Sequence, residues 1–259
     1  MRPTQAALKV VTVQTGQRYP DLWVSRLAAM VGRNLSEAHR FIVYTDRPEP
    51  ARFDGPSTQH QQLEVRDLQG GGLKGFFGKL KLFDQGLTGG DPFLYLDNTL
   101  VIRSNLGPLV ELGRTSHSSV IGVRDWNYPI LNSSVLWCRP DAHTQAVWQC
   151  WQRGRYAAAA FPGDQNFIFK VFNDHAPGAL SYWPPGWVSS YKALRKLARR
   201  DPEAARGQLE ASSILKFHGQ PKPNEVLHPW RHPRRTILRN PLRPRLWGYL
   251  GEELRRHWH

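Results

Sequence analysis

A short apolar run that ends in an acidic residue constrains the fold of this chain more than any other feature. Phe93–Leu96 is apolar throughout and is followed at once by Asp97. Four consecutive apolar residues are typical of a strand buried on both faces of a parallel sheet. The carboxyl ends of such strands form the crevice where open α/β sheets bind their ligands. Asp97 is therefore predicted to hold a divalent cation or a ribose hydroxyl, unless Asp97 and Asn98 form only a turn.

The segments before this strand alternate in a way that predicts an α/β sheet. Leu8–Val13 is rich in β-branched residues, helically spaced apolar residues follow from Pro20 to Arg33, and Phe41–Tyr44 is a second apolar run. The order strand, helix, strand is that of a right-handed parallel crossover. A chain of 259 residues is long enough for one large domain and short for two. We predict one α/β domain with a mostly parallel central sheet flanked by helices.

Five short motifs follow one another in order along most of the chain. They are Phe77–Phe83, Tyr95–Asp97, Asn132–Ser134, Gly163–Gln165 and Phe217–Pro223. This series resembles the glycogenin-type, family 8-like nucleotide-sugar glycosyltransferases of GT-A fold. The resemblance implies a Rossmann-like GT-A domain in residues 8–225, followed by a basic, aromatic C-terminal extension in residues 226–259.

The activity that the resemblance implies is a hexosyl transfer. Such an enzyme moves a sugar from a nucleoside diphosphate donor, here expected to be a UDP-sugar, to an acceptor. The acceptor can be a glycan, a lipid or a protein, and the family implies retention at the anomeric carbon. A second interpretation stays open, in which the chain binds sugar nucleotides or glycans without catalysis.

The chain departs from the family at its central strand. The family's strand ends in Asp-x-Asp, but alignment on Asp97 places Thr99 where the second carboxylate would be. The resemblance implies a divalent cation, manganese above all, with Asp97, Thr99 and His218 as its ligands. A hydroxyl brings less charge to a hard cation than a carboxylate, so we expect metal to bind well only together with the nucleotide.

Several residues near predicted strand ends are candidates for binding the donor. Lys79 is assigned to the nucleotide or its phosphates by resemblance, and Tyr19 is placed to stack on a base. The alternatives are a surface lysine with a buried stem and an aromatic packing contact beside a helix start. The predicted donor-binding residues are Thr12, Tyr19, Lys79, Asp97, Asn98, Asn132, Ser133, Gly219 and Lys222.

Two segments are predicted to face the donor sugar. Asn132 and Ser133 offer hydrogen-bonding groups without bulk, so a sugar ring could approach the backbone; a turn before a strand explains them as well. By resemblance, Asp164 and Gln165 are the catalytic residues and reach the sugar from the start of a helix. Asp164 is also suited to an N-cap, whereas Gln165 has no capping role and discriminates better between the two interpretations.

A loop after the predicted strand Ser213–Phe217 is suited to phosphate. His218 supplies a nitrogen ligand for a transition metal, Gly219 allows close backbone approach to a diphosphate, and Lys222 neutralises the leaving group. A lone histidine in a loop is usually only solvated, but this one begins a His-Gly-x-x-Lys-Pro sequence. Gly70–Gly72 lacks the spacing of a P-loop and predicts a hinge or a rim instead.

The positive charge is concentrated toward the C-terminal end. Of a net charge of +14, the segment from Ser190 onward carries +10, from 16 Lys and Arg against 6 Asp and Glu. Arginines interleaved with aromatic residues suit an anionic membrane surface. The competing prediction is that the tail folds back, with Trp230, Trp247 and Trp258 buried in grooves. Nucleic acid ranks lowest as a partner, because no RNA-binding signature accompanies the charges.

The remaining sequence signals concern the compartment. Cys138 and Cys150 lack metal-ligand spacing and are predicted to be buried free thiols in a reducing compartment. We see no signal-peptide pattern and no apolar run long enough to span a bilayer. We therefore expect a cytoplasmic protein whose tail makes peripheral contact with a membrane.

Overall fold

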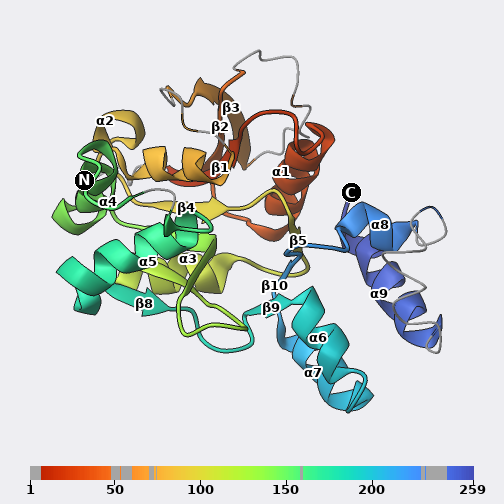
Figure 1. Cartoon of the computed structure of the whole chain (residues 1–259). Helices are drawn as coiled ribbons and strands as arrows, with labels where there is room; N and C mark the ends of the chain where they lie inside the picture. The colour runs from red at the N-terminus through yellow and green to blue at the C-terminus, as the bar shows by residue number, and fades with distance from the viewer. Residues whose placement is uncertain are drawn as a thin grey trace.

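The computed structural model describes residues 7–47, 53, 60–69, 73, 75–157, 160–228, 231 and 244–259, with only the backbone for 244–250. A seven-stranded sheet forms its centre. The strands are β1 (Leu8–Gln14), β2 (His39–Thr45), β3 (Gln61–Asp67), β4 (Phe93–Leu96), β6 (Val120–Arg124), β7 (Leu131–Cys138) and β8 (Leu180–Tyr182). Their order across the sheet is β3-β2-β1-β4-β7-β6-β8 (Figure 1). The first four run parallel, β7 is antiparallel to β4 and β6, and β8 is parallel to β6.

Helices cover both faces of this sheet. They are α1 (Leu22–Asn34), α2 (Gln85–Thr88), α3 (Gly107–Thr115), α4 (Ala142–Gln152), α5 (Asp164–His175) and two 3-10 helices, η2 (Gly75–Phe83) and η4 (Pro177–Ala179). Buried residues of α1 and α3 share one apolar cluster with the sheet, and those of η2, α4 and α5 share another. The predicted mostly parallel sheet flanked by helices is confirmed.

A second, three-stranded sheet positions the C-terminal part of the chain against the first. It contains β5 (Leu100–Ile102), β9 (Val188–Ser190) and β10 (Ile214–Lys216), in the order β5-β10-β9. Because β5 begins only three residues after Asp97, and β10 pairs antiparallel with β5, Lys216 lies opposite Leu100. This pairing brings the end of β10 beside the end of β4.

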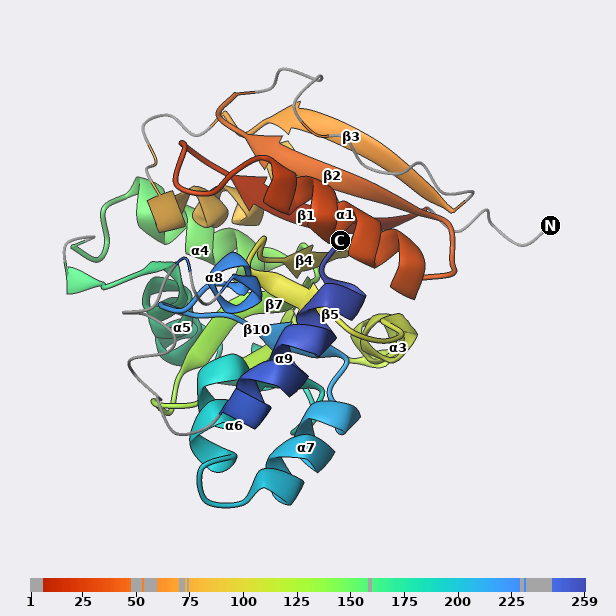
Figure 2. The ribbon, with the colours of Figure 1, turned by 90° about the vertical axis from the view of Figure 1, so that its right-hand side faces the viewer.

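The last helices pack onto this second sheet and onto α1. They are α6 (Tyr191–Leu197), α7 (Pro202–Ala211), α8 (Pro223–Leu227) and α9 (Pro244–His257). Figure 2 shows α9 over the small sheet with the chain end next to α1. Trp258 is 2% exposed and meets Trp23 edge-on with ring centroids 5.6 Å apart, and Glu253 pairs with Arg103 at 2.6 Å. The end of the tail therefore belongs to the core of the molecule.

The structure tests one of the two predictions for the C-terminal tail, that it folds back, and only in part. Folding back is confirmed for Trp258, whereas the side chains of Trp230 and Trp247 lie outside the described residues. Arg231 is exposed, but most of the arginine-rich segment after it is not described. Contact with an anionic membrane stays a prediction. No helix in the described part of the chain is long and apolar enough to cross a membrane.

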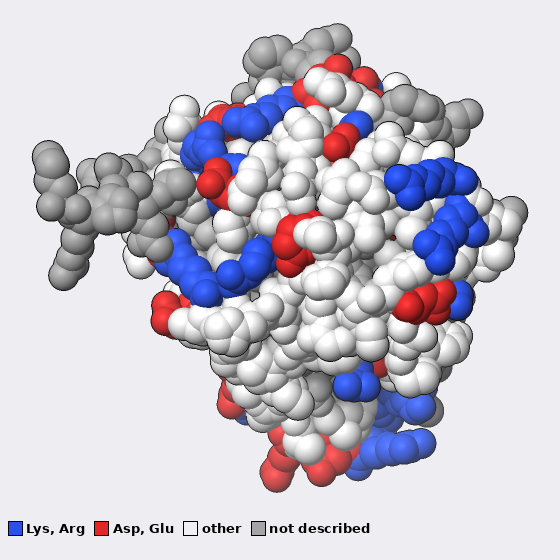
Figure 3. All heavy atoms as spheres, turned by 90° about the vertical axis from the view of Figure 1, so that its left-hand side faces the viewer, with Lys and Arg blue, Asp and Glu red and all other residues white. Residues whose placement is uncertain are grey.

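Surface charge is mixed on the face shown in Figure 3. Lysines and arginines form small separate groups there, with acidic residues among them and uncharged atoms between them. The described residues of this face therefore do not form a continuous basic surface. The two cysteines are buried free thiols, as predicted.

Three local predictions differ from the structure. The polar, Pro- and Gly-rich composition of residues 47–62 predicts a loop with at most a short strand near Leu63–Val65. In the structure Gln61–Asp67 is a full strand, because all seven residues pair with β2 at an edge where polar side chains are tolerated. The apolar residues after Gly70–Gly72 predict one helix over Leu73–Leu87. The structure has a 3-10 helix there, followed by a short α-helix. Asn132–Ser134 lie within β7 rather than in a turn before a strand. The predicted hinge at Gly70–Gly72 lies outside the described residues.

Candidate active site

A cavity of about 300 Å³ opens where the carboxyl ends of β1 and β4 meet β7, α5 and the loop after β10. Nearly all the residues predicted for binding, catalysis or metal line it. These are Tyr19, Lys79, Asp97, Asn98, Thr99, Asn132, Ser133, Asp164, Gln165, His218, Gly219 and Lys222. The structure thus brings together residues that are far apart in the sequence.

Thr12 is the exception. Its side chain is 0% exposed inside β1, and the residues that this strand contributes to the cavity are Val13 and Gln14, followed by Thr15. The strand continues past the predicted end at Val13 to Gln14, which moves the crevice further along the chain. Gln14 takes part in the site by accepting a hydrogen bond from the Asn98 amide at 2.5 Å.

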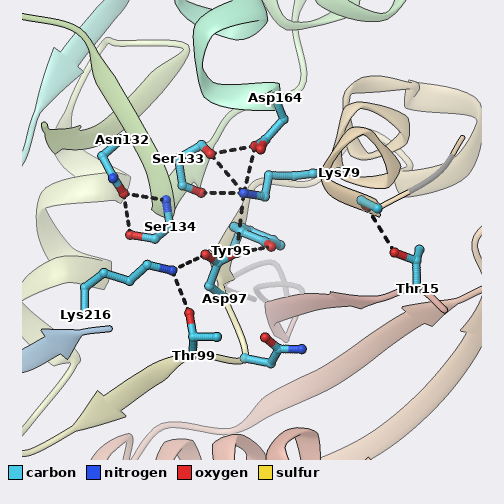
Figure 4. Close-up of polar contacts among 12 residues, drawn as sticks. Thr15, Lys79, Tyr95, Asp97, Thr99, Asn132, Ser133, Ser134, Asp164 and Lys216 are labelled. Atoms are coloured by element: carbon cyan, nitrogen blue, oxygen red, sulfur yellow. Dashed lines mark hydrogen bonds and ion pairs between the residues drawn. The ribbon is translucent and has the colours of Figure 1, made fainter. Parts of the chain in front are cut away.

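Lys79 lies in a buried pocket of oxygen atoms rather than at the surface (Figure 4). Its Nζ is 2.8 Å from Asp164 Oδ2 and 3.4 Å from Asp97 Oδ1, and it donates to both the carbonyl and the hydroxyl of Ser133. Burial alone would lower the pKa of Lys79, but Asp164 and Asp97 raise it above its ordinary value. Its side chain is 9% exposed, which excludes the surface-lysine alternative.

The 3-10 geometry of η2 explains how Lys79 reaches this place. With about three residues per turn, side chains three apart in the sequence lie in one row. Phe76 and Lys79 form such a row, and both line the cavity. Gly78 allows the helix to approach β1 closely, since a Cβ there would lie 2.9 Å from a Thr15 methyl group.

Asp97 accepts two hydrogen bonds and forms an ion pair with Lys79. Tyr95 Oη donates to its Oδ1 at 2.7 Å, Lys216 Nζ donates to its Oδ2, and Lys79 lies on the other side (Figure 4). Burial would raise the pKa of Asp97, but Lys216 and Lys79 hold it far below its usual range, so the carboxylate is ionised. Asp97 is therefore more than part of a turn.

Lys216 is a site residue that the sequence interpretation missed. Its Nζ also donates to Thr99 Oγ1 at 2.7 Å. Burial lowers the pKa of Lys216, and Asp97 offsets this only partly. The available signal was a lysine between Leu215 and Phe217 in an otherwise apolar strand, because a charge in such a position is rarely buried without a partner.

The residues predicted to face the sugar are held by neighbouring carboxylates. Ser133 Oγ donates to Asp164 Oδ2 at 2.6 Å, and Asn132 Nδ2 donates to Asp125 Oδ2 at 3.0 Å. Gly163 occupies the N-cap of α5 and Asp164 is its first helical residue. Asp164 is therefore not the N-cap itself, but it lies in the first turn, where a carboxylate is also favoured. Gln165 follows it and lines the cavity.

The loop after β10 is fixed by its histidine. His218 Nε2 lies 2.6 Å from Ser190 Oγ, and the ring stacks on Trp126 with an angle of 3° between the planes. Burial, helped by Lys192 and Lys216, lowers the pKa of His218 to about 4, so the ring is neutral near pH 7. Gly219 follows with φ of +64°, a left-handed conformation that favours glycine.

Aromatic and cationic residues form the far side of the cavity. Tyr19 stacks on Trp23 with ring centroids 5.1 Å apart, which confirms the packing alternative while leaving Tyr19 in the cavity wall. Lys222 Nζ lies 5.1 Å from the Tyr19 ring centroid, and burial lowers the pKa of Lys222 to about 8. Arg18 and the half-exposed Phe76 also line this side, and neither was among the predicted site residues.

The residues proposed as metal ligands do not fit a divalent cation in this arrangement. Asp97 and Thr99 share the ammonium group of Lys216, while His218 directs Nε2 to Ser190. Within the described ranges, no three His, Cys, Asp or Glu side chains gather in a way that could hold a metal ion. Manganese stays a prediction from the resemblance.

The fold is that of solved glycosyltransferase structures. The chain is similar to the glycosyltransferase GlyE of Streptococcus pneumoniae, with a TM-score of 0.62 and 16% identity over 83% of this chain and 56% of that one. It is similar to the galactosyltransferase LgtC, solved with donor and acceptor sugar analogs, with a TM-score of 0.55 and 14% identity over 83% and 89% of the two chains. It is also similar to the bifunctional glycosyltransferase WbbM, with a TM-score of 0.59 and 12% identity over 92% of this chain and 53% of that one.

These comparisons establish a GT-A fold. The chain spans little more than half the length of the GlyE and WbbM chains that it matches. No protein-family model matches it, and no curated protein sequence does either. The fold and the cavity at its strand ends agree with the glycosyltransferase class to which the structural neighbours belong.

Proposed function

We propose that this protein is a glycosyltransferase that moves a sugar from a nucleoside diphosphate donor to an acceptor glycan. One observation carries the proposal: carboxylate and lysine side chains lie together in a single cavity at the carboxyl ends of the parallel strands. Asp97 and Asp164 lie there with Lys79, Lys216 and Lys222. A nucleotide sugar needs both kinds of group, because its diphosphate is anionic and its sugar is rich in hydroxyls.

The diphosphate belongs, in this proposal, on the side of the loop after β10. Lys216 and Lys222 supply positive charge, and Gly219 exposes backbone without a side chain. Breaking the bond between sugar and diphosphate leaves extra negative charge on the leaving phosphate. Cations already in place stabilise that charge without reorganising during the reaction. UDP is the nucleotide that the family resemblance favours.

The sugar belongs on the opposite side, against β7 and the start of α5. Asp164 is fixed by Lys79 and Ser133, so its carboxylate can accept hydrogen bonds from sugar hydroxyls without moving. Gln165 lines the cavity one residue further along and brings an amide that can both donate and accept. We assign Gln165 to the face of the anomeric carbon, with retention of configuration as the expected outcome.

A donor-hydrolysis and transfer assay tests this function. A panel of UDP-sugars is incubated with the full chain, and release of UDP is followed with and without candidate acceptors. We expect hydrolysis of at least one donor, faster with the right acceptor, and NMR of the product gives its anomeric configuration. Donor binding without any hydrolysis or transfer would favour the non-catalytic interpretation.

A matched pair of variants ties the activity to the cavity. Gln165→Ala removes the amide at the proposed anomeric face and is expected to lower turnover about 100-fold or more, as loss of a transition-state contact does. Gln149→Ala is the control, because Gln149 is an exposed residue of α4 outside the cavity lining. Equal activity of the two variants, with equal melting temperatures, would contradict the assignment.

A further inference from the structure

A lysine occupies the position between the two residues that the family pattern would give to a metal ion. Lys216 Nζ donates to Asp97 Oδ2 and, at 2.7 Å, to Thr99 Oγ1 (Figure 4). The side chain is 7% exposed, so the ammonium group is enclosed by the protein. The two oxygen atoms that could receive a cation therefore already have one.

The backbone fixes this lysine in place. Lys216 pairs with Leu100 in the antiparallel ladder of β10 and β5, and the Phe217 amide donates to the Thr99 carbonyl at 3.2 Å. Asp97 is the residue directly after β4. The ammonium group is thus positioned by two strands of the small sheet rather than by a mobile loop.

Charge explains why a divalent ion does not fit beside it. A metal ion bound by Asp97 and Thr99 would lie about 2 Å from their oxygens, which is the space that the ammonium group fills. Asp97 also has Lys79 Nζ 3.4 Å from its other oxygen. The Asp97 carboxylate would then face three cationic groups, namely the metal ion, Lys216 and Lys79. In the family pattern a second carboxylate also binds the ion, but Thr99 stands at that position in this chain.

We propose that Lys216 replaces the divalent cation of this site, so that its ammonium group, held by Asp97 and Thr99, binds the diphosphate of the donor without a metal ion. This rests on the proposed function, because the ligand is the diphosphate of the proposed donor. Lys222 lines the same cavity and shares the diphosphate. The pair supplies two positive charges, as one divalent ion would.

Calorimetry on the unmodified full chain tests the proposal. UDP is titrated into the protein in excess EDTA and again in manganese chloride, with GDP and ADP in parallel. We expect the dissociation constant of the preferred nucleotide to agree within about twofold between the two conditions. Binding that requires manganese, or tightens tenfold or more with it, overturns the role of Lys216 and leaves the proposed function standing. Failure of all three nucleotides in both conditions overturns the proposed function and this inference with it.

Two variants and a control sharpen the result. Lys216→Met keeps the apolar stem and removes the charge, and we expect nucleotide affinity to fall about ten- to a hundredfold, as for loss of a charged hydrogen bond. Lys170→Met is the control, because Lys170 lies on the surface in a pair with Asp174. Affinity of Lys216→Met equal to that of the control would overturn the proposal.

A double variant tests whether the lysine and the metal are interchangeable. Thr99→Asp combined with Lys216→Met restores a second carboxylate and clears the space between the two acids. We expect nucleotide binding by this variant to depend on manganese, with affinity rising at least tenfold when the metal is added. If manganese does not change the nucleotide affinity of the double variant, the lysine and the metal ion are not interchangeable. Melting curves identify a variant that does not fold, and the EDTA and manganese titrations of the unmodified chain then decide.

Discussion

The two sides of Asp97 differ in the balance of charge around their lysines. On the side of β7 and α5, Lys79 has two carboxylates and the Ser133 oxygens as neighbours, and the carboxylates of Asp164 and Asp97 raise its pKa. On the side of β10, burial lowers the pKa of Lys216 and brings that of Lys222 to about 8. On the first side, acceptors surround the lysine. On the second side, the lysines have fewer anionic neighbours, so positive charge is in excess.

This difference indicates that the lysines on the two sides have different roles. A lysine whose bonds are all satisfied within the protein holds Asp164 and Asp97 in position. A lysine that is buried with too few anions gains from an anionic ligand, because the ligand supplies the missing charge. We therefore expect changes at Lys79 to affect folding first, and changes on the β10 side to affect nucleotide binding first.

The largest effect is expected from Lys79→Met. The change leaves the buried Asp164 carboxylate without its cation, and losing one partner of a buried pair costs about 3–5 kcal/mol of unfolding free energy. Chemical denaturation measures it, with Lys170→Met as the exposed control expected to cost under about 1 kcal/mol. If Lys79→Met loses no more unfolding free energy than the control, the proposed difference between the two sides is wrong.

The pH dependence of nucleotide binding tests the other side. Lys222 has a lowered pKa of about 8 in the free protein, so it is charged below that pH and loses its proton above it. A bound diphosphate favours the charged form. Nucleotide affinity is therefore expected to fall about tenfold from pH 7 to pH 9, by the linkage between proton and ligand binding.

Calorimetry across this pH range measures the effect, and Lys222→Met is the matched control. This variant should bind more weakly at pH 7 and lose the part of the pH dependence that Lys222 supplies. Its stability should be preserved, because burial already disfavours the charge that the change removes. An identical pH profile for the variant and the unmodified chain would show that Lys222 does not contact the diphosphate.

The smallest effect is expected from Ser133→Ala. Its hydroxyl accepts from Lys79 and donates to Asp164. Without the hydroxyl, Lys79 and Asp164 still pair with each other, and Lys79 still donates to the Ser133 carbonyl. Loss of the hydroxyl should cost about 1 kcal/mol of unfolding free energy. Ser104→Ala, at an exposed serine paired with Ser213, is the control in the same denaturation experiment. A cost above that of Lys79→Met would place the serine, not the lysine, at the centre of this side.

Much of the fold could be predicted from local patterns. Phe93–Leu96 and Leu8–Val13 carry the periodicity and β-branched residues of buried strands, and Asp97 marks the end of one of them. Parallel strands share a carboxyl edge, so polar residues at several strand ends could be expected to meet. The error at Thr12 comes from placing the end of β1 one residue early, because strand boundaries are set by pairing with neighbours as well as by composition.

The role of Lys216 could not be predicted in the same way. Its partners, Asp97 and Thr99, are more than a hundred residues away in the sequence, and they meet it only through the antiparallel pairing of β5 with β10. Nothing local distinguishes this pairing from others of similar composition. The 3-10 form of η2 was equally hidden, since its apolar residues also suit an α-helix.

A crystal structure of the protein grown with UDP and manganese tests the central claim most directly. The account predicts diphosphate oxygens within hydrogen-bonding distance of Lys216 and Lys222, with Lys79 still paired to Asp164 and the Lys216 ammonium group still between Asp97 and Thr99. A manganese ion in that place with Lys216 displaced, a diphosphate bound to Lys79, or UDP bound outside this cavity would contradict it.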